Sequence, residues 1–332
     1  MPVKAPDFWQ KDKSLRAKLL APFGFLFSLL GMSRFKRARP YRSKVPVICI
    51  GNLVMGGVGK TPLAVSVAEY FKMNGRRPVF LTRGYGGGLK SALINADGVY
   101  TAKDTGDEAQ ILARVAPVVV SADRKKGAVV AEKTGADVII MDDGFQNPQL
   151  AKDLSFAVFD GHYGFGNGKV FPAGPLREKP EQGLARADAC LIVGEDTSGI
   201  REKVAELFPD LPCLSVHIEQ DKRVLDTLNG RKVFAFAGIG YPAKFFRMLS
   251  GNGVDVVGTK AFSDHHPYTE NDIEALLKTA EAKGADIVLT TSKDGVRLPE
   301  KYREKITVVE AYTVWDTPEG ISDLLVPFLR RE

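Results

Sequence analysis

The sequence has few cysteines and no pattern that would pair them. Its 332 residues include only Cys49, Cys190 and Cys213, and none stands at the short spacing of a disulfide framework or a zinc cluster. We therefore expect neither, and the chain fits a reducing compartment. Glycine and proline are scattered and no heptad repeat persists, which excludes collagen-like, low-complexity and coiled-coil structures.

A uniform excess of one charge is also missing. Residues 1–50 hold 11 lysines and arginines against 2 acidic residues, whereas the rest of the chain holds 35 against 38. A nearly neutral body behind a basic front end argues against a nucleic-acid-binding protein. Hydrophobic residues make up 44% and charged residues 26%, as in soluble globular proteins, and the length indicates two domains.

The front end contains an apolar run that is short for a membrane span. Residues 19–33 carry no charge, but they number only 15 and include Pro22 and Gly24, whereas a span takes about 20. Cations flank the run on both sides, and the absence of a small-residue cleavage site argues against a signal peptide. Two interpretations stay open: a segment lying in the membrane interface, or a helix packed on the protein's own core.

Short β-rich runs alternate with helical stretches from residue 45 onwards. Buried strands are expected at 45–52, 77–84, 116–123, 136–144, 154–161 and 187–194. A second series follows at 213–220, 232–240, 254–262, 285–294 and 306–312. This alternation predicts a doubly wound, mostly parallel α/β sheet and a second, smaller α/β domain. The dipeptide Asn229-Gly230 suggests a hairpin as a two-stranded join between them.

The strongest functional signal is a glycine-rich stretch between the first strand and the next helix. It consists of Gly56, Gly57, Val58, Gly59, Lys60, Thr61 and Pro62. Glycines let backbone N–H groups face a polyphosphate, a lysine reaches its terminal oxygens, and a threonine hydroxyl can bind Mg²⁺. Val54 stands where the strict motif has glycine, so we expect a GGxGK[ST] variant of the P-loop that binds ATP and Mg²⁺.

Further polar residues follow the predicted strands. Asp142 and Asp143 end the run VIIM, where a metal-binding carboxylate belongs in a P-loop protein. Other charged residues after strands or in loops are Arg83, Asp107, Glu108, Arg124, Arg177 and Glu178. The carboxyl ends of parallel strands form the ligand crevice of an open sheet, which favours a shared site. Asp107, which opens a helix, is equally well explained as an N-cap.

Two adjacent histidines stand beside an aspartate in the second domain, in the run Asp264-His265-His266. Adjacent residues of an extended segment point apart, so at most one histidine is expected to face a given ligand. Because no other cysteine or histidine is near, we favour a base oriented by a carboxylate over a metal site.

Together these motifs resemble one family, the tetraacyldisaccharide 4′-kinases of lipid A biosynthesis. The similar segments run in order between residues 51 and 298: GNLVMGGVGKTP, TRGYGGG, GDEAQ, SADR, DDGFQ, GNGKVFPAGPLRE, FAGIGYPAKFF, FSDHHPY and TSKDGVRL. The resemblance implies a peripheral enzyme at the cytoplasmic face of the bacterial inner membrane. It also implies transfer of the γ-phosphoryl of ATP to the 4′-hydroxyl of an acylated disaccharide 1-phosphate.

The resemblance also implies how the chain is divided and which residues act. We expect a basic, apolar membrane-surface segment (1–44) packed on a P-loop ATP-binding domain (45–220), and a smaller α/β domain (221–332), joined by a two-stranded ribbon, that closes the cleft. The family's metal-site acids fall on Asp142 and Asp143, its catalytic aspartate on Asp107 and the histidine partner on His265. Its PLRE arginine and glutamate fall on Arg177 and Glu178. The expected partners are the lipid substrate and an anionic membrane surface, with no nucleic acid and no obligate protein.

One departure and one alternative complete the analysis. Where the family is expected to read DDGFQH, this chain has Asn147, which leaves the role of that histidine open. The competing hypothesis is an ATP-driven membrane switch of the MinD/ParA kind, which also carries GGVGKT. Those proteins have a lysine before the double glycine, where this chain has Met55, and their membrane anchor is usually C-terminal.

Overall fold

Nine strands form the larger of two sheets in the computed structural model, which describes residues 6–11, 13–95 and 99–329. Their order is β13-β8-β7-β6-β1-β5-β2-β4-β3, and only the edge strands β3 and β13 run antiparallel to their neighbours. They span β1 (Val47–Gly51), β2 (Pro78–Thr82), β3 (Ser91–Ile94), β4 (Val118–Ser121), β5 (Val138–Asp142), β6 (Leu154–Asp160), β7 (Ala189–Val193), β8 (Cys213–Gln220) and β13 (Ala311–Trp315). The predicted doubly wound, mostly parallel sheet is confirmed.

Helices cover both faces of this sheet, which is why its strands are almost continuously apolar. One face packs against α2 (Lys60–Met73), α4 (Asp107–Ala113) and α12 (Pro318–Leu325). The other face packs against α5 (Arg124–Lys133), α6 (Pro180–Leu184) and α7 (Ile200–Leu207). The short α3 (Ala102–Thr105) leads into α4, and the single turn η3 (Val326–Leu329) follows α12.

The second sheet has four parallel strands in the order β10-β9-β11-β12. They span β9 (Lys232–Ala237), β10 (Asp255–Ala261), β11 (Ile287–Thr291) and β12 (Thr307–Val309). One face packs against α8 (Lys222–Asp226) and α9 (Pro242–Gly251), and the other against α10 (Glu270–Ala282). The short α11 (Ser292–Gly295) and η2 (Glu300–Lys305) lie between β11 and β12. The predicted smaller α/β/α domain is therefore present.

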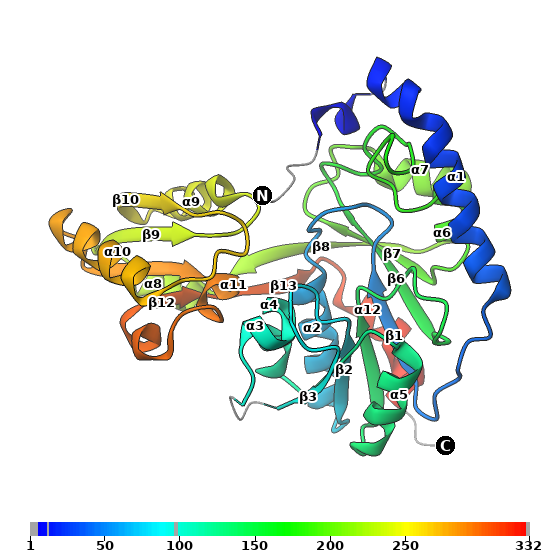
Figure 1. Cartoon of the computed structure of the whole chain (residues 1–332), viewed down its shortest axis with the longest axis horizontal. Coiled ribbons are helices and arrows are strands. Elements are labelled where there is room, and N and C mark those ends of the chain that lie inside the picture. Colours follow the sequence, from blue (N-terminus) through cyan, green and yellow to red (C-terminus); the bar gives the residue numbers. More distant parts are fainter. Residues whose placement is uncertain (1–5, 12, 96–98, 330–332) are drawn as a thin grey trace.

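The strand expected over 306–312 is divided between the two sheets. Glu310 separates β12, in the small sheet, from β13, which pairs antiparallel with β8 at the edge of the large one. Strands β8 and β13 form the two-stranded ribbon that joins the domains (Figure 1). The chain after residue 310 thus returns to the larger domain, where Ile321 and Leu325 of α12 enter the core. This differs from the boundary of 221–332 expected for the smaller domain.

The hairpin predicted at Asn229-Gly230 is wrong. Residues 222–226 form the helix α8 instead of a strand, and the dipeptide lies in the turns that follow it, with Gly230 at φ 71°. Asn-Gly favours any turn that needs positive φ, so the dipeptide alone does not distinguish a hairpin from a helix exit. The strand partner of β8 comes from 91 residues further along the chain, where β13 begins.

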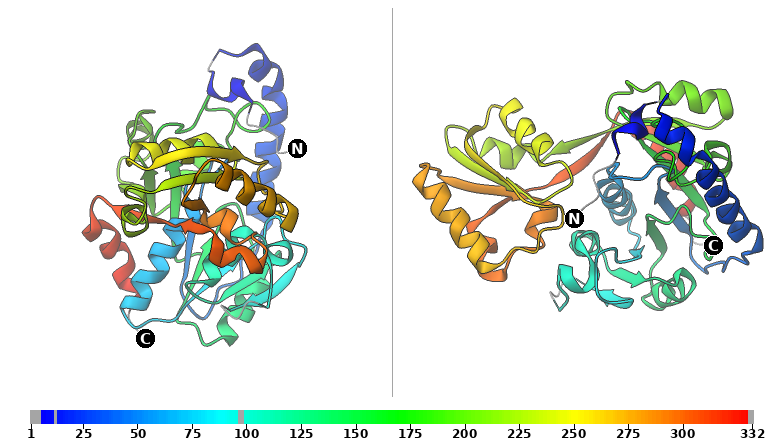
Figure 2. Two further views of the ribbon diagram at one scale, coloured as in Figure 1. Left: turned by 90° about the vertical axis from the view of Figure 1, so that its left-hand side faces the viewer. Right: turned by 45° about the horizontal axis from the view of Figure 1, so that its top comes forward.

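The apolar front end forms a surface helix, α1 (Leu15–Arg37), after the single turn η1 (Asp7–Gln10). It lies along the outer side of the larger domain, beside α6 (Figures 1 and 2). Only Ala17, Gly24 and Ser28 of this helix are buried, whereas its large apolar side chains, such as Phe23 (61% exposed) and Leu30 (60%), face outwards. This segment therefore does not form a helix buried in the protein's own core. Among the described residues, α1 is the one helix long and apolar enough to cross a membrane by length and composition.

Candidate active site

The glycine-rich stretch links the central strand β1 to α2, as the sequence predicts. Residues Gly56 to Gly59 form the loop, and α2 begins at Lys60, so that Thr61 and Pro62 lie in its first turn. The buried side chain of Asn52 holds the loop, because its Nδ2 donates to the carbonyl oxygen of Val54 at 2.6 Å. Backbone N–H groups at the amino end of α2 are therefore available to an anion.

A second loop, residues 166–178, packs against the segment that leads into the glycine-rich loop. The backbone N–H of Met55 donates to Pro175 O at 2.8 Å, and that of Arg177 donates to Leu53 O at 2.7 Å. These contacts place Arg177 and Glu178 beside the loop. The Glu178 carboxylate accepts from Gln146 Nε2 at 3.0 Å and from Arg186 Nη2 at 2.6 Å, so Glu178 is engaged within the protein.

Asp142 and Asp143 lie at the end of β5, directly beside β1. Asp142 is buried, and its Oδ1 has no hydrogen-bond partner among the described residues. Burial, and then the nearby Glu108, raise the pKa of Asp142 to about 7, against the opposing effect of Lys60. Asp143, in contrast, contacts two cations: its Oδ1 lies 3.5 Å from Lys60 Nζ and 3.1 Å from Arg177 Nη1. Although burial opposes them, these two cations hold the pKa of Asp143 below its usual range.

Two further predicted arginines follow β2 and β4. Arg124 is buried, donates to Ser121 O, and keeps an Nε without a partner among the described residues. Burial lowers the pKa of Arg124 to about 10, and the charge of the nearby Arg83 acts in the same direction. Arg83 itself is exposed. Both guanidinium groups belong to the same edge of the sheet as Asp142 and Asp143.

The two domains meet at Asp107. This residue is the first of α4, but the N-cap is Gly106. Gly106 has a φ of 87°, and a Cβ added there would lie 2.2 Å from Tyr85 O, so no side chain fits at this position. The Asp107 carboxylate instead faces the smaller domain, and its Oδ2 lies 2.7 Å from His265 Nδ1. The hydrogen bond to Asp107 raises the pKa of His265 above its ordinary value. Glu108, next on α4, lies 3.4 Å from Lys293 Nζ of the same facing domain.

The neighbouring histidine takes no part in this contact. His266 turns towards the amino end of α10, where its Nε2 lies 3.3 Å from Asp272 Oδ2. The two adjacent histidines thus serve different partners, in agreement with the expectation that only one faces a given ligand. Asn147, at the point of departure from the family motif, contacts Gln149 and Lys152.

Sequence reasoning missed two charged residues that complete this interface. Arg297 Nε lies 3.3 Å from Asp107 Oδ2, and Arg297 also binds Asp294, which is fully buried. Both residues follow the carboxyl end of β11. Asp142 was predicted because it ends a strand, and the same search for acidic residues at strand ends could also have found Asp294. Gln146 and Arg186 were missed as well, because their roles depend on side-chain contacts with Glu178.

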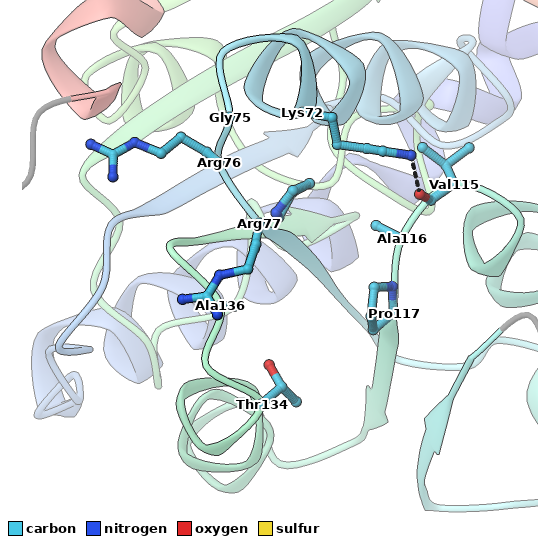
Figure 3. Close-up of a pocket in the computed structure, with 10 residues that line it drawn as sticks. Lys72, Gly75, Arg76, Arg77, Val115, Ala116, Pro117, Thr134 and Ala136 are labelled. Carbon is cyan, nitrogen blue, oxygen red and sulfur yellow. Dashed lines mark hydrogen bonds between the residues drawn. The ribbon is translucent and has the colours of Figure 1, made fainter.

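A cavity of about 440 Å³ lies elsewhere, at the opposite edge of the large sheet (Figure 3). The residues that line it precede or open strands, as Pro78 does at β2 and Pro117 before β4. The residues predicted to act come from the carboxyl ends of the same strands. The chemistry of the charged edge is thus separate from this cavity.

Comparisons with known proteins match the chain to one family. The family model for tetraacyldisaccharide-1-P 4′-kinases matches residues 16–329. A tetraacyldisaccharide 4′-kinase of Paramagnetospirillum magneticum is 48% identical over 323 residues, which cover 97% of this chain and 98% of that protein. One of Rhodospirillum rubrum is 44% identical over 328 residues, 98% of each chain. The crystal structure of the "apo" form of LpxK from Aquifex aeolicus in complex with ATP has a TM-score of 0.75 at 27% identity and covers 96% of this chain and 100% of that chain.

These matches extend over nearly the whole chain and include both domains. They do not favour the alternative of an ATP-driven membrane switch, since relatives named tetraacyldisaccharide 4′-kinase align with this chain over nearly their full length. The chain therefore belongs to the tetraacyldisaccharide 4′-kinase family, and it is an ATP-dependent kinase that phosphorylates the 4′ position of its disaccharide substrate in lipid A biosynthesis.

Proposed function

We propose that the phosphoryl transfer takes place where the two domains meet, with Asp107 as the base and His265 as its partner. The observation that carries this proposal is the 2.7 Å contact between Asp107 Oδ2 and His265 Nδ1, which links residues from separate domains. A sugar hydroxyl is a poor nucleophile, and a base within hydrogen-bond reach contributes about 10²–10⁴-fold. Asp107 accepts the proton of the 4′-hydroxyl, and His265 orients the carboxylate or shares that proton.

The glycine-rich loop binds the triphosphate in this proposal. Backbone N–H groups of residues 56 to 61 surround the phosphates, and Lys60 moves from Asp143 towards their terminal oxygens. Pro62 costs α2 little, because the N–H that it lacks has no partner within the first turn of a helix. Charge neutralisation of this kind dominates the catalysis of phosphoryl transfer.

The same edge fits a Mg²⁺ ion. The unpartnered Oδ1 of buried Asp142 is a hard oxygen ligand left without a hydrogen bond, and carboxylate and hydroxyl oxygens are the ligands that Mg²⁺ prefers. Thr61, Asp142 and Asp143 are the residues that would hold it. No group of three or more histidine, cysteine, aspartate or glutamate residues in the described chain forms a complete site, so phosphate oxygens would supply the remaining ligands. When bound, the ion neutralises charge on the phosphates.

The remaining charged residues fit an anionic acceptor. The disaccharide named by the family carries a 1-phosphate, and Arg83 and Arg124 present positive charge at the same edge of the sheet. Arg177, Glu178 and Glu108 complete the wall of the site. We assign the two arginines to the acceptor or to the transferred phosphoryl group, and Arg177 to Asp143, to which it donates at 3.1 Å.

Helix α1 brings the site to the membrane in this proposal. A tetraacylated acceptor stays in the bilayer, so its kinase must work at the surface. The outward Phe and Leu side chains of α1 can insert at the headgroup boundary of a membrane. Six exposed cations come after them in the sequence and can bind anionic lipid: Arg34, Lys36, Arg37, Arg39, Arg42 and Lys44. Since ATP is a cytoplasmic substrate, the enzyme lies at the cytoplasmic face of the inner membrane as a peripheral protein.

The dyad is tested by measuring kcat for Asp107→Ala, His265→Ala and the double variant. If the two residues act as a unit, each single change lowers kcat strongly and the double variant is little worse than either. Independent structural roles would instead give losses that multiply. His266→Ala, next to His265 but bound to Asp272, is the matched control and should keep most of the activity. Unimpaired turnover of His265→Ala would remove the smaller domain from the chemistry.

Membrane attachment is tested with a triple substitution on the outer face of α1. Replacing Phe23, Leu26 and Leu30 by serine should weaken cosedimentation with anionic vesicles, and added salt should weaken binding of the parent protein. A control with three exposed apolar residues elsewhere, Met73, Val130 and Leu207, replaced by serine should bind as the parent does. Equal sedimentation of both variants would contradict the proposal.

A further inference from the structure

Arg297 is a buried cation whose guanidinium group is fully engaged. Only 6% of its side chain is exposed. Its Nε donates to Lys293 O at 2.9 Å, its Nη1 to His266 O at 3.0 Å, and its Nη2 to Gly238 O at 3.1 Å. The same Nη2 donates to Asp294 Oδ1 at 3.1 Å. A planar fork of five N–H donors can satisfy such divergent acceptors at once, whereas a lysine ammonium cannot.

These contacts hold the turn that carries His265. His265 adopts a left-handed backbone conformation, with φ at 56°, which is strained for a residue other than glycine. Its backbone N–H donates to Gly238 O, the carbonyl that Arg297 also binds, and Arg297 binds the carbonyl of the next residue, His266. Gly238 is held in turn by Asp294, whose Oδ1 accepts from Gly238 N at 2.8 Å. Arg297 therefore ties both sides of the strained turn to one rigid group.

Arg297 also reaches the other domain. Its Nε lies 3.3 Å from Asp107 Oδ2, the oxygen that faces His265. Asp294 binds a different nitrogen of Arg297, Nη2, and its oxygens also accept from Tyr268 and Thr291. Of the other groups around His265, Asp264 lies 3.9 Å from Nε2, and the ring of Tyr85 lies 6.3 Å away. Arg297 is thus the cation that contacts the proposed base directly.

We infer that Arg297 is a positioning residue for phosphoryl transfer: it locks the His265 turn in its strained conformation and contacts the Asp107 carboxylate across the domain interface. The inference rests on the proposed dyad and adds to it a residue of separate function. It explains why a complete site needs the smaller domain, since that domain supplies the histidine and also the arginine that holds its turn and contacts the base. The Arg297 side chain is buried and bound within the protein, so we expect its effect to pass through Asp107 and His265.

The test is kcat and KM of Arg297→Gln and Arg297→Lys, each measured alone and combined with His265→Ala. Arg297→Gln loses the charge and part of the fork, so kcat should fall about tenfold or more while the KM for ATP stays near that of the parent. Arg297→Lys keeps the charge but loses the fork, so kcat should still fall several-fold because the turn is loosened. Since Arg297 acts through His265, neither change should lower kcat much further in the His265→Ala background.

Controls separate the outcomes of this experiment. Arg303→Gln changes an exposed arginine of η2 and should leave both kcat and KM as in the parent. Melting temperatures show whether each variant is folded. Full activity of folded Arg297→Lys, or a loss that multiplies with that of His265→Ala, would overturn the inference. Asp107→Ala measured in parallel tests the dyad itself: retained turnover there refutes the proposed base, whereas lost turnover there with unimpaired Arg297→Gln refutes only the role of Arg297.

Discussion

The charged contacts of Lys60 join it to two other residues of the proposed site. Its ammonium group lies 3.5 Å from Asp143, and Asp143 is shared with Arg177. Such a contact keeps the lysine at the mouth of the glycine-rich loop, where only 12% of its side chain is exposed. A triphosphate carries more negative charge than one carboxylate, so we expect it to displace Asp143 from the lysine. The contact costs little to break, because Arg177 continues to balance Asp143.

We predict that Lys60→Ala lowers kcat by about a thousandfold or more, because removing one preorganised charge at the transition state costs about 10²–10³ and Lys60 is also proposed to bind ATP. Steady-state kinetics with saturating acceptor measure the loss. Lys72→Ala, an exposed lysine near the end of the same helix that donates to Val115 O, is the control and should keep normal turnover. Near-normal activity in folded Lys60→Ala would contradict the assignment of the phosphate site.

At the scale of the element, α1 is held to the protein by a narrow stripe. Ala17, Gly24 and Ser28 face inwards, the Phe27 ring contacts the ring of Phe171, and Ser28 Oγ donates to Gln182 Oε1 at 3.4 Å. Small residues let the helix backbone approach loop 166–178 closely, as an added Cβ at Gly24 would lie 2.6 Å from Val170 O. The rest of the helix surface therefore stays free for another apolar environment.

We expect Gly24→Ala to loosen α1, because the added methyl group collides with a backbone carbonyl that cannot move aside. The melting temperature should fall and protease cleavage near α1 should become faster. Gly31→Ala is the matched control, since an added Cβ there meets no heavy atom within 4 Å. Alanine is favoured over glycine in a helix by up to about 1 kcal/mol, so the control should be neutral or slightly stabilised. Equal behaviour of the two variants would show that α1 is not docked through Gly24.

For the whole molecule, the return of the chain after residue 310 decides how the domains depend on each other. The smaller domain is inserted between β8 and β13, and α12 then packs beside α2 on the large sheet. Trp315 Nε1 of β13 donates to Ser66 Oγ of α2 at 2.9 Å. The larger domain is consequently built from both ends of the sequence, and the two strands of the ribbon join it to the smaller domain.

Leu325→Ala should destabilise the ATP-binding domain by about 2–5 kcal/mol, although residue 325 lies far in sequence from the glycine-rich loop. Leu325 is fully buried in the core that also contains Leu63 of α2. Urea unfolding, monitored through the loss of nucleotide binding, measures the change in stability. Val326→Ala, at the adjacent and 41% exposed position, should change stability by less than about 0.5 kcal/mol. A smaller domain that unfolds alone in Leu325→Ala would contradict this assignment of α12.

The sequence alone determined what depends on neighbouring residues. Nearly continuous apolar runs predicted the strands, because parallel strands covered on both faces have no polar side to show. Glycines, lysine and threonine in a row predicted the phosphate loop, and acidic residues at the end of a strand predicted Asp142 beside it. The sequence pattern made Asp107 and one of the two adjacent histidines candidates, and the family resemblance assigned their roles to Asp107 and His265. The 2.7 Å distance between them comes from the structure.

Only the tertiary structure decided what depends on contacts between distant segments. Nothing local to 306–312 shows that Glu310 separates two sheets, because β12 and β13 find their partners in β11 and β8. Arg297 reads as an ordinary surface cation until the fold buries it against Asp107. The apolar run of α1 fits a core helix as well as a surface one, since the composition of a helix does not tell what covers it. Burial and pairing are properties of the whole chain, and for that reason they appear only when it is folded.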